Sequence, residues 1–350
     1  YDGSFLQLAG MALKRGMDEF SLRKHQLNAI WRGLVNNRGI YGHEVGTGKT
    51  FTMVGIAMES RRFGIARKPV LFAHNSNSAS IAADANVMYP GAKVLYVESL
   101  GKKNIKTELY RIANEDWDLI VIPHSLIDNF SLSKETLEAL AAEEIANLED
   151  AALEAARDDG VPLTIEMMNN EDAIKGLRSY TAKELVKQRN KILERIKKQA
   201  LLSSNEDAVA FEQLGIDQIL VDEAHVFKKP PLATKRKMKG LARSTSERSL
   251  SLYFLTQYVK QKNNGAGVHL FTGTPITNSL VEIYNMMRYV MDSDMRKTGV
   301  ADWDSWFASF ADSDTDVELT TTGEYEPVTR LAQFVNTAEL RQMAGQYMDI

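Results

Sequence analysis

The sequence has 350 residues, a formal net charge of −4, six scattered histidines and no cysteine. The lack of cysteine excludes disulfides, thiol catalysis and cysteine-based metal sites, and the slightly acidic charge gives no global sign of nucleic-acid binding, which must therefore rest on local patches. A chain of this length with 44% hydrophobic residues can bury a large core and predicts two domains, while no apolar run approaches the length of a membrane span.

The N-terminal part of the chain predicts two helices. The first helix is suggested within residues 1–20 by the apolar residues Phe5, Leu6, Leu8, Met11 and Leu13. The second helical pattern runs from Leu22 to Val35 and carries Gln26, which taken alone is best explained as a surface glutamine.

The stretch from Arg38 to Thr50 has the pattern of a phosphate-binding loop between a strand and a helix. The helix is expected to run to about Phe63. Glycines let the backbone curl so that N–H groups face an anion, and the helix N-terminus adds a favourable dipole. The tight turn consists of Gly46, Thr47 and Gly48.

Two side chains at the start of that helix would supply the chemistry. Lys49 would reach the β- and γ-phosphates of a nucleotide as a point charge, and the Thr50 hydroxyl would ligate Mg²⁺. The full loop pattern asks for glycine at position 43, where this chain has His43. A glycine-rich turn with a solvated lysine is the alternative interpretation.

Further apolar segments, alternating with helical patterns, predict a parallel sheet with right-handed crossovers. The segment that ends at Val221 is followed by two carboxylates, Asp222 and Glu223. Alone, such a pair is usually a solvated strand end. Together with the loop upstream it predicts a nucleotide hydrolase, in which Asp222 holds Mg²⁺ and Glu223 polarises the attacking water.

Three motifs in chain order resemble motifs I, II and III of superfamily 2 helicases, closest to the SNF2 branch. They are G-I-Y-G-H-E-V-G-T-G-K-T, V-D-E-A-H (a DEAH box) and L-F-T-G-T-P-I-T-N, and the resemblance extends from Leu22 to Asn278. The family tolerates a non-glycine residue at the position of His43. The arrangement also resembles the helicase part of helicase–methyltransferase proteins of phages and mobile elements.

The resemblance implies a RecA-like P-loop NTPase lobe of the α/β class, with a parallel sheet flanked by helices. It implies ATP and Mg²⁺ as cofactors, double-stranded DNA and a second RecA-like lobe as partners, and the cytoplasm of a bacterial or phage-infected cell as the location. Gln26 would read adenine, His225 would link the nucleotide site to motif III, and Thr272 and Thr274 would sense the γ-phosphate. The implied catalytic residues are Glu223, Lys49, His225, Thr272 and Thr274; the nucleotide-binding residues are Gln26, Gly46, Thr47, Gly48, Lys49 and Thr50; Mg²⁺ would be held by Thr50 and Asp222.

Residues 131–202 interrupt the α/β pattern and predict an inserted helical hairpin. Its first arm is acidic and its second is basic, so we expect the arms to pair with each other rather than to grip DNA. The lobe would then comprise residues 1–130 and 203–290. Residues 291–350 would form an extension toward an absent second lobe, loop-rich over 312–327 and ending in a helix over 337–348.

A basic loop at residues 228–239 follows motif II, and either a flexible surface loop or a phosphate contact would explain it. Two other functions stay open. One is a protein-remodelling ATPase of the AAA type, and the other is a nucleotide- or DNA-binding module that is inactive in isolation. The chain begins without methionine and ends within a pattern, so we expect a fragment with weak activity alone.

Overall fold

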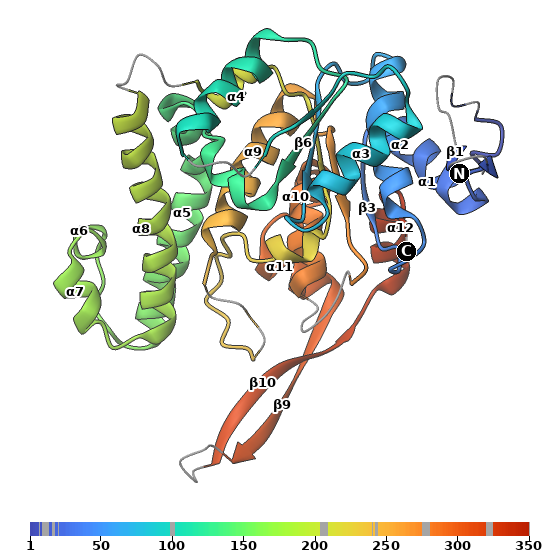
Figure 1. Ribbon diagram of the computed structural model, residues 1–350. Helices are drawn as coiled ribbons and strands as arrows, with labels where there is room; N and C mark the ends of the chain where they lie inside the picture. The colour runs from blue at the N-terminus through green and yellow to red at the C-terminus, as the bar shows by residue number, and fades with distance from the viewer. Residues whose placement is uncertain are drawn as a thin grey trace.

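The computed structural model describes residues 1–6, 8, 14–15, 18–19, 21–98, 102–203, 209–239, 241, 244–274, 281–319 and 325–349. Seven strands within these ranges form one sheet (Figure 1). They are β3 (Arg38–Tyr41), β4 (Pro69–Ala73), β5 (Val94–Tyr96), β6 (Leu119–Pro123), β7 (Gln218–Val221), β8 (Val268–Phe271) and β11 (Met348–Asp349).

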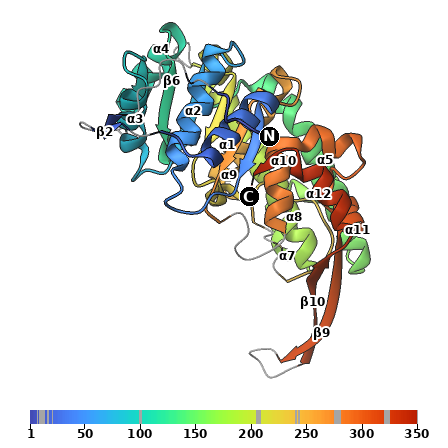
Figure 2. The same cartoon turned by 90° about the vertical axis from the view of Figure 1, so that its right-hand side faces the viewer.

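The sheet is parallel throughout, in the order β11-β3-β8-β7-β4-β6-β5. Helices cover both of its faces (Figures 1 and 2), so the expected α/β class with a parallel sheet flanked by helices is confirmed. The helices are α1 (Lys24–Asn36), α2 (Lys49–Arg62), α3 (Ser78–Met88), α4 (Lys102–Asn114), α5 (Lys134–Asp158), α6 (Ile165–Met168), α7 (Glu171–Gly176), α8 (Tyr180–Ser203), α9 (Glu247–Lys262), α10 (Val281–Lys297), α11 (Trp303–Phe310) and α12 (Thr337–Gly345).

Each face of the sheet has its own hydrophobic core, because successive side chains of a strand point to opposite sides. Leu71 and Leu220 pack into the core beneath α1, α2 and α3. Their neighbours Phe72 and Val221 pack into the opposite core with α9 and α10. Burial on both faces explains why the strands are short continuous apolar runs.

The strand order places β3, β8 and β7 side by side. These are the strands that precede motifs I, III and II. In a parallel sheet the carboxyl ends of neighbouring strands meet at one edge. The fold therefore brings together three motifs that are far apart in the sequence.

The segment between β6 and β7 contains the expected helical hairpin. Helices α5 and α8 lie side by side at one end of the molecule (Figure 1), and Leu137 and Leu148 are buried in the same core as Leu185 and Ile192. That core also contains one face of the sheet. The division of the chain at residues 131–202 stays a prediction.

The charges of the two arms of the hairpin pair with each other only in part. Arg189 and Glu149, 2.7 Å apart, form an ion pair between the two arms, but other carboxylates of α5 bind the lobe. The acidic arm therefore attaches the hairpin to the rest of the protein. Its contacts outside the hairpin are Glu143 with Arg296, Glu144 with Arg288, and both Glu154 and Asp158 with Lys235.

Of two expectations about the ends of the chain, one is not tested and one was wrong. The described part of residues 1–20 shows no helix, and β1 (Lys14–Arg15) pairs with β2 (Asp18–Glu19); Met11 and Leu13 lie outside the described residues, so the first helix stays a prediction. The region expected to be loop-rich contains a long antiparallel ribbon of β9 (Ala311–Leu319) and β10 (Tyr325–Phe334). The ribbon projects from the body of the protein (Figures 1 and 2). Because few of its side chains can face a hydrophobic core, its sequence is polar and resembles that of a loop.

The final helix ends earlier than expected. Helix α12 stops at Gly345, and the chain then forms β11, which pairs with β3 at the edge of the sheet. Nothing in the local pattern of so short a strand distinguishes it from the end of a helix.

The attachment of the hairpin suggests a stability test. Arg288 donates to the Glu144 carboxylate and to the Tyr253 hydroxyl, and the paired side chains are only 8% and 10% exposed. Glu144→Ala leaves a buried guanidinium without its counter-charge, so we expect a loss of about 3–5 kcal/mol in the free energy of unfolding, measured by urea denaturation.

The matched control is Glu143→Ala, one residue earlier, which removes a half-exposed ion pair with Arg296. A loss of at most about 1 kcal/mol is expected there. Equal losses in the two variants would show that the buried pair does not hold the hairpin to the lobe.

Candidate functional site

The loop after β3 has the backbone that a phosphate-binding turn requires. Gly46 and Gly48 have φ angles of +88° and +84°, in the left-handed region that side chains disfavour. A Cβ atom at Gly48 would also lie 2.4 Å from the side-chain nitrogen of Gln26. Glycine at position 48 is therefore required twice, by backbone conformation and by space.

Lys49 lies at the first position of α2, and its ammonium group folds back over the turn. Its Nζ donates to the backbone carbonyls of His43 at 3.1 Å and Glu44 at 3.4 Å. A Cβ atom at Gly273 of motif III would lie 3.5 Å from the same Nζ. The lysine thus lies between the loop and motif III, at the N-terminus of α2.

Gln26 of α1 is hydrogen-bonded to the backbone of this loop. The residue is 5% exposed, and its side-chain amide nitrogen donates to the backbone carbonyls of Thr47 at 3.3 Å and Gly48 at 3.2 Å. Its amide oxygen accepts from the backbone N–H of Arg23 at 2.8 Å. Gln26 therefore braces the turn from α1, and the adenine-reading role implied by the motif resemblance stays a prediction.

Asp222 and Glu223 follow β7 at the same edge of the sheet. Asp222 is 3% exposed, and burial, together with the charge of Glu223, raises the pKa of its carboxyl to about 6. Glu223 is a non-glycine residue with a φ of +47°. Such a conformation costs of order 1–3 kcal/mol and occurs most often at functional sites.

Motif III is hydrogen-bonded to both other motifs. The Nδ1 atom of His225 lies 3.2 Å from Glu223 Oε2 and 3.1 Å from the hydroxyl of Thr272. That hydroxyl accepts from the backbone N–H of Thr274 at 3.1 Å, and the Thr272 N–H donates to the carbonyl of Tyr41 at the end of β3. Residues 275–278 of the motif lie outside the described residues.

The oxygen ligands expected for magnesium are compatible with that ion. Thr50 is the second residue of α2 and Asp222 is a buried carboxylate, and Mg²⁺ in proteins prefers such oxygens and retains water or phosphate ligands. Within the described ranges no group of three or more His, Asp or Glu side chains could hold a metal ion. An ion at this place would complete its shell with phosphate and water.

The loops that follow β4 and β6 are hydrogen-bonded to each other. The side-chain oxygen of Asn75, after β4, accepts from the backbone N–H of Ser125, after β6, at 3.1 Å. His74 directly precedes Asn75, and both loops lie at the same edge of the sheet as the phosphate loop. This edge is where the motif resemblance implies contact with a nucleic-acid strand.

The basic loop after motif II is engaged within the protein. Lys228 pairs with Glu282, Lys235 with two carboxylates of α5, Arg236 with Asp304 and Lys237 with Asp159. In this structure these four side chains are paired with carboxylates of the same chain, and the phosphate contact stays a prediction. Their carboxylate partners are far away in the sequence, and no local pattern revealed them.

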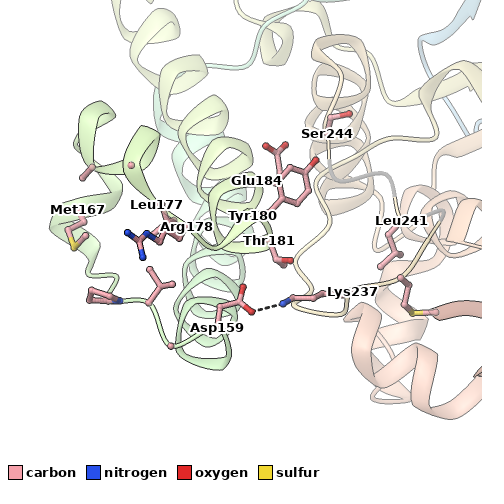
Figure 3. Close-up of a pocket in the computed structure, with 16 residues that line it drawn as sticks. Asp159, Met167, Leu177, Arg178, Tyr180, Thr181, Glu184, Lys237, Leu241 and Ser244 are labelled. Atoms are coloured by element: carbon pink, nitrogen blue, oxygen red, sulfur yellow. Dashed lines mark hydrogen bonds and ion pairs between the residues drawn. The ribbon is translucent and has the colours of Figure 1, made fainter. Parts of the chain in front are cut away.

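A groove of about 1360 Å³ lies between this loop and the far end of the hairpin. Figure 3 shows Asp159 and Lys237 facing each other across it, with Tyr180 and Thr181 on the hairpin side. None of the expected nucleotide-site residues lines this groove. The chemistry is concentrated at the sheet edge instead.

One residue of the site was missed by the sequence analysis. His43 donates from Nε2 to the carboxylate of Asp349 at 2.9 Å, across 306 residues of sequence. Asp349 belongs to β11, which no sequence pattern predicted. Its position beside the phosphate loop is visible only in the folded chain.

A family model described as "Probable helicase domain" matches residues 31–350. The chain belongs to this helicase family. Membership carries nucleotide binding with it, since helicases are driven by nucleoside triphosphates. None of the helices in the described ranges combines the length and hydrophobicity needed to cross a membrane.

The chain is also similar to individual proteins. It is 26% identical over 136 residues to the defense against restriction protein B of Escherichia phage P1, covering 37% of this chain and 6% of that protein. Among solved structures it is similar to the Sulfolobus solfataricus SWI2/SNF2 ATPase core in complex with dsDNA, with a TM-score of 0.48, 11% identity and coverage of 98% of this chain and 46% of that one. It is similar to the UvsW helicase of bacteriophage T4 with a TM-score of 0.40, 10% identity and coverage of 80% and 62%.

The glycine geometry of the loop gives a test of nucleotide binding. Gly48→Ala puts a methyl group against Gln26 in a left-handed conformation, so we expect MgATP affinity to fall at least about 10-fold as the turn is displaced. Titration of a fluorescent ATP analogue measures this loss.

The control is Gly64→Ala, at another glycine of positive φ, +71°, with no atom within 4 Å of the added Cβ. It carries the same backbone strain, about 1 kcal/mol, without the clash. If both variants bind nucleotide alike, the turn around Gly48 is not the phosphate site.

Proposed function

We propose that this chain is the ATP-binding lobe of a DNA-dependent ATPase, an SNF2-like helicase or translocase that couples ATP hydrolysis to movement on or remodelling of DNA. The observation that carries the proposal is the meeting of three motifs at one sheet edge. The His225 ring lies within hydrogen-bond distance of both Glu223 and Thr272. Such a relay is suited to coupling hydrolysis to motion.

The roles of the residues follow from position and charge. Lys49 neutralises the β- and γ-phosphates, and Thr50 and Asp222 hold Mg²⁺, which supplies charge neutralisation for the transferred phosphoryl group. Glu223 orients the attacking water. Thr272 and Thr274 sense the phosphate state through His225. The phosphate-binding turn is formed by Gly46, Thr47 and Gly48, and Gln26 supports it.

Two features support DNA as the partner polymer. The motif resemblance is closest to the SNF2 branch, and the loops at His74 and Ser125 lie at the catalytic edge. We propose double-stranded DNA and a second RecA-like lobe as partners. The lobe would comprise residues 1–130 and 203–290, with 131–202 inserted and 291–350 leading onward.

Turnover by this chain alone would be weak. An arginine supplied across a cleft is worth roughly 10³–10⁵ in rate in P-loop NTPases. The chain spans 6% of the phage P1 protein and 46% of the Sulfolobus solfataricus chain. A complete enzyme would place such an arginine on another lobe.

Two substitutions separate binding from hydrolysis. Lys49→Ala should remove MgATP binding, because it deletes the phosphate contact. Glu223→Gln, made in the full-length protein, should keep binding and reduce turnover about 10²-fold or more, because only the water loses its partner. Calorimetry and steady-state ATPase rates measure the two effects; a Glu223→Gln enzyme with normal turnover would show that the acid roles are wrong.

The polymer is tested with the full-length protein. ATPase rates are compared with double-stranded DNA, single-stranded DNA and RNA at equal nucleotide concentration and fixed salt, because phosphate contacts are salt-dependent. We expect the greatest stimulation with duplex DNA. Stimulation by an unfolded protein instead of DNA would favour a protein-remodelling ATPase of the AAA type.

A further inference from the structure

The strand β11 lies against the start of the phosphate loop. The N–H of Ile40 donates to the carbonyl of Tyr347 at 2.8 Å, and the N–H of Gly42 donates to the carbonyl of Asp349 at 2.7 Å. Arg32 of α1 donates to the carbonyl of Met348. These contacts use the backbone carbonyls of residues 347–349, so the strand is held in place independently of the Asp349 side chain.

The Asp349 side chain has a separate contact with the loop. Its Oδ2 accepts from His43 Nε2 at 2.9 Å, and its Oδ1 lies 3.8 Å from the Arg32 guanidinium. Burial opposes ionisation of this carboxyl, but the hydrogen bond from His43 and the charge of Arg32 outweigh it and lower the pKa of Asp349. The carboxylate is therefore a charged hydrogen-bond acceptor for the histidine.

His43 is held on several sides. Its side chain is 11% exposed, and its ring meets the rings of Tyr41 and His25 edge to face at 6.0 and 6.2 Å. The backbone carbonyl of His43 accepts from Lys49 Nζ at 3.1 Å. A line of contacts thus runs from Asp349 through the His43 ring and backbone to the ammonium group at the phosphate site.

We propose that Asp349 is a positioning residue of the phosphate loop and acts through His43. By fixing the histidine ring it fixes the His43 carbonyl, and this carbonyl holds the Lys49 ammonium over the turn. The inference rests on the proposed nucleotide site and deepens it. It assigns a role in that site to the segment after α12, which no motif marks.

A cavity of about 290 Å³ lies beside the loop and suggests another role for the His43–Asp349 pair, which the experiment has to distinguish. It is lined by His25, Asn28, His43, Thr47 and Asp349, so the pair could instead touch the nucleoside part of a nucleotide. Inorganic tripolyphosphate has the phosphates of ATP without the nucleoside. A residue that positions the loop affects both ligands alike, whereas a residue that contacts the nucleoside affects ATP alone.

The experiment measures dissociation constants of magnesium ATP and magnesium tripolyphosphate by calorimetry. The proteins are the 350-residue chain, Asp349→Ala, His43→Ala and the double variant. Each single variant should weaken both ligands about 10-fold, which is the effect of losing a charged hydrogen bond. The double variant should be no weaker than either single, because the two side chains act as one unit.

Two further variants separate positioning from folding. Asp349→Asn keeps an oxygen that accepts from His43 and should restore affinity to within about 3-fold of the unmodified chain. Asp294→Ala removes the 2.7 Å ion pair with Arg38 at the other end of β3. It should lower the thermal midpoint without changing either dissociation constant, and all titrations are made well below the lowest midpoint.

Several outcomes would overturn the proposal. They are additive losses in the double variant, weakening of ATP alone, or unchanged affinity in Asp349→Ala. Lys49→Ala distinguishes this failure from failure of the function itself. If Lys49→Ala abolishes binding while Asp349→Ala has no effect, only the positioning role is wrong; if Lys49→Ala binds normally, the nucleotide site is wrong.

Discussion

The parallel pairing of β3, β8 and β7 is the constraint on which the rest of the site depends. Their registers align Tyr41 with Phe271 and Val221 with Leu270, so the three strands end together. The residues proposed to bind nucleotide and to catalyse its hydrolysis lie mostly in the first few positions after each strand. Because each strand is buried on both faces, a slip in register would move apolar side chains out of two cores at once. The fold therefore holds the motifs in relative position more firmly than any contact among the motifs themselves.

After this sheet, the peripheral elements are attached by a set of ion pairs, of which the Glu144–Arg288 pair is buried. The Glu144–Arg288 pair joins the hairpin to α10, and the basic loop after motif II is bound to carboxylates of α5 and α11. In the sequence alone, the same charged residues are interpreted as an acidic helix and as a patch that binds nucleic acid. Their mutual neutralisation directs the search for DNA contacts to the strand ends at His74 and Ser125.

Much of the core site could be predicted because its signals are local. A strand, a glycine turn and a helix start are adjacent in the sequence around Lys49, and a strand and two carboxylates are adjacent at Asp222. What failed were features set by partners distant in the chain. The ribbon β9–β10 has little core to face, so its strands show no clear apolar period. The strand β11 is too short for a pattern, and the ion-pair partners of Lys235 and Lys237 lie on α5 and just beyond it. Local chemistry could be inferred, and long-range pairing could not.

His43 shows how a departure from a motif can be tolerated. Among the described residues, the non-glycine residues with positive φ are Asn37, Glu223, Asn264 and Asn336, and His43 is not one of them. The backbone at position 43 therefore does not need glycine, unlike positions 46 and 48, where φ is strongly positive. With no conformational reason for glycine, a side chain at this point can serve as an anchor. The loop is then braced by Gln26 from α1 on one side and by Asp349 from β11 on the other, and its shape depends less on glycine at its first position than on these two supports.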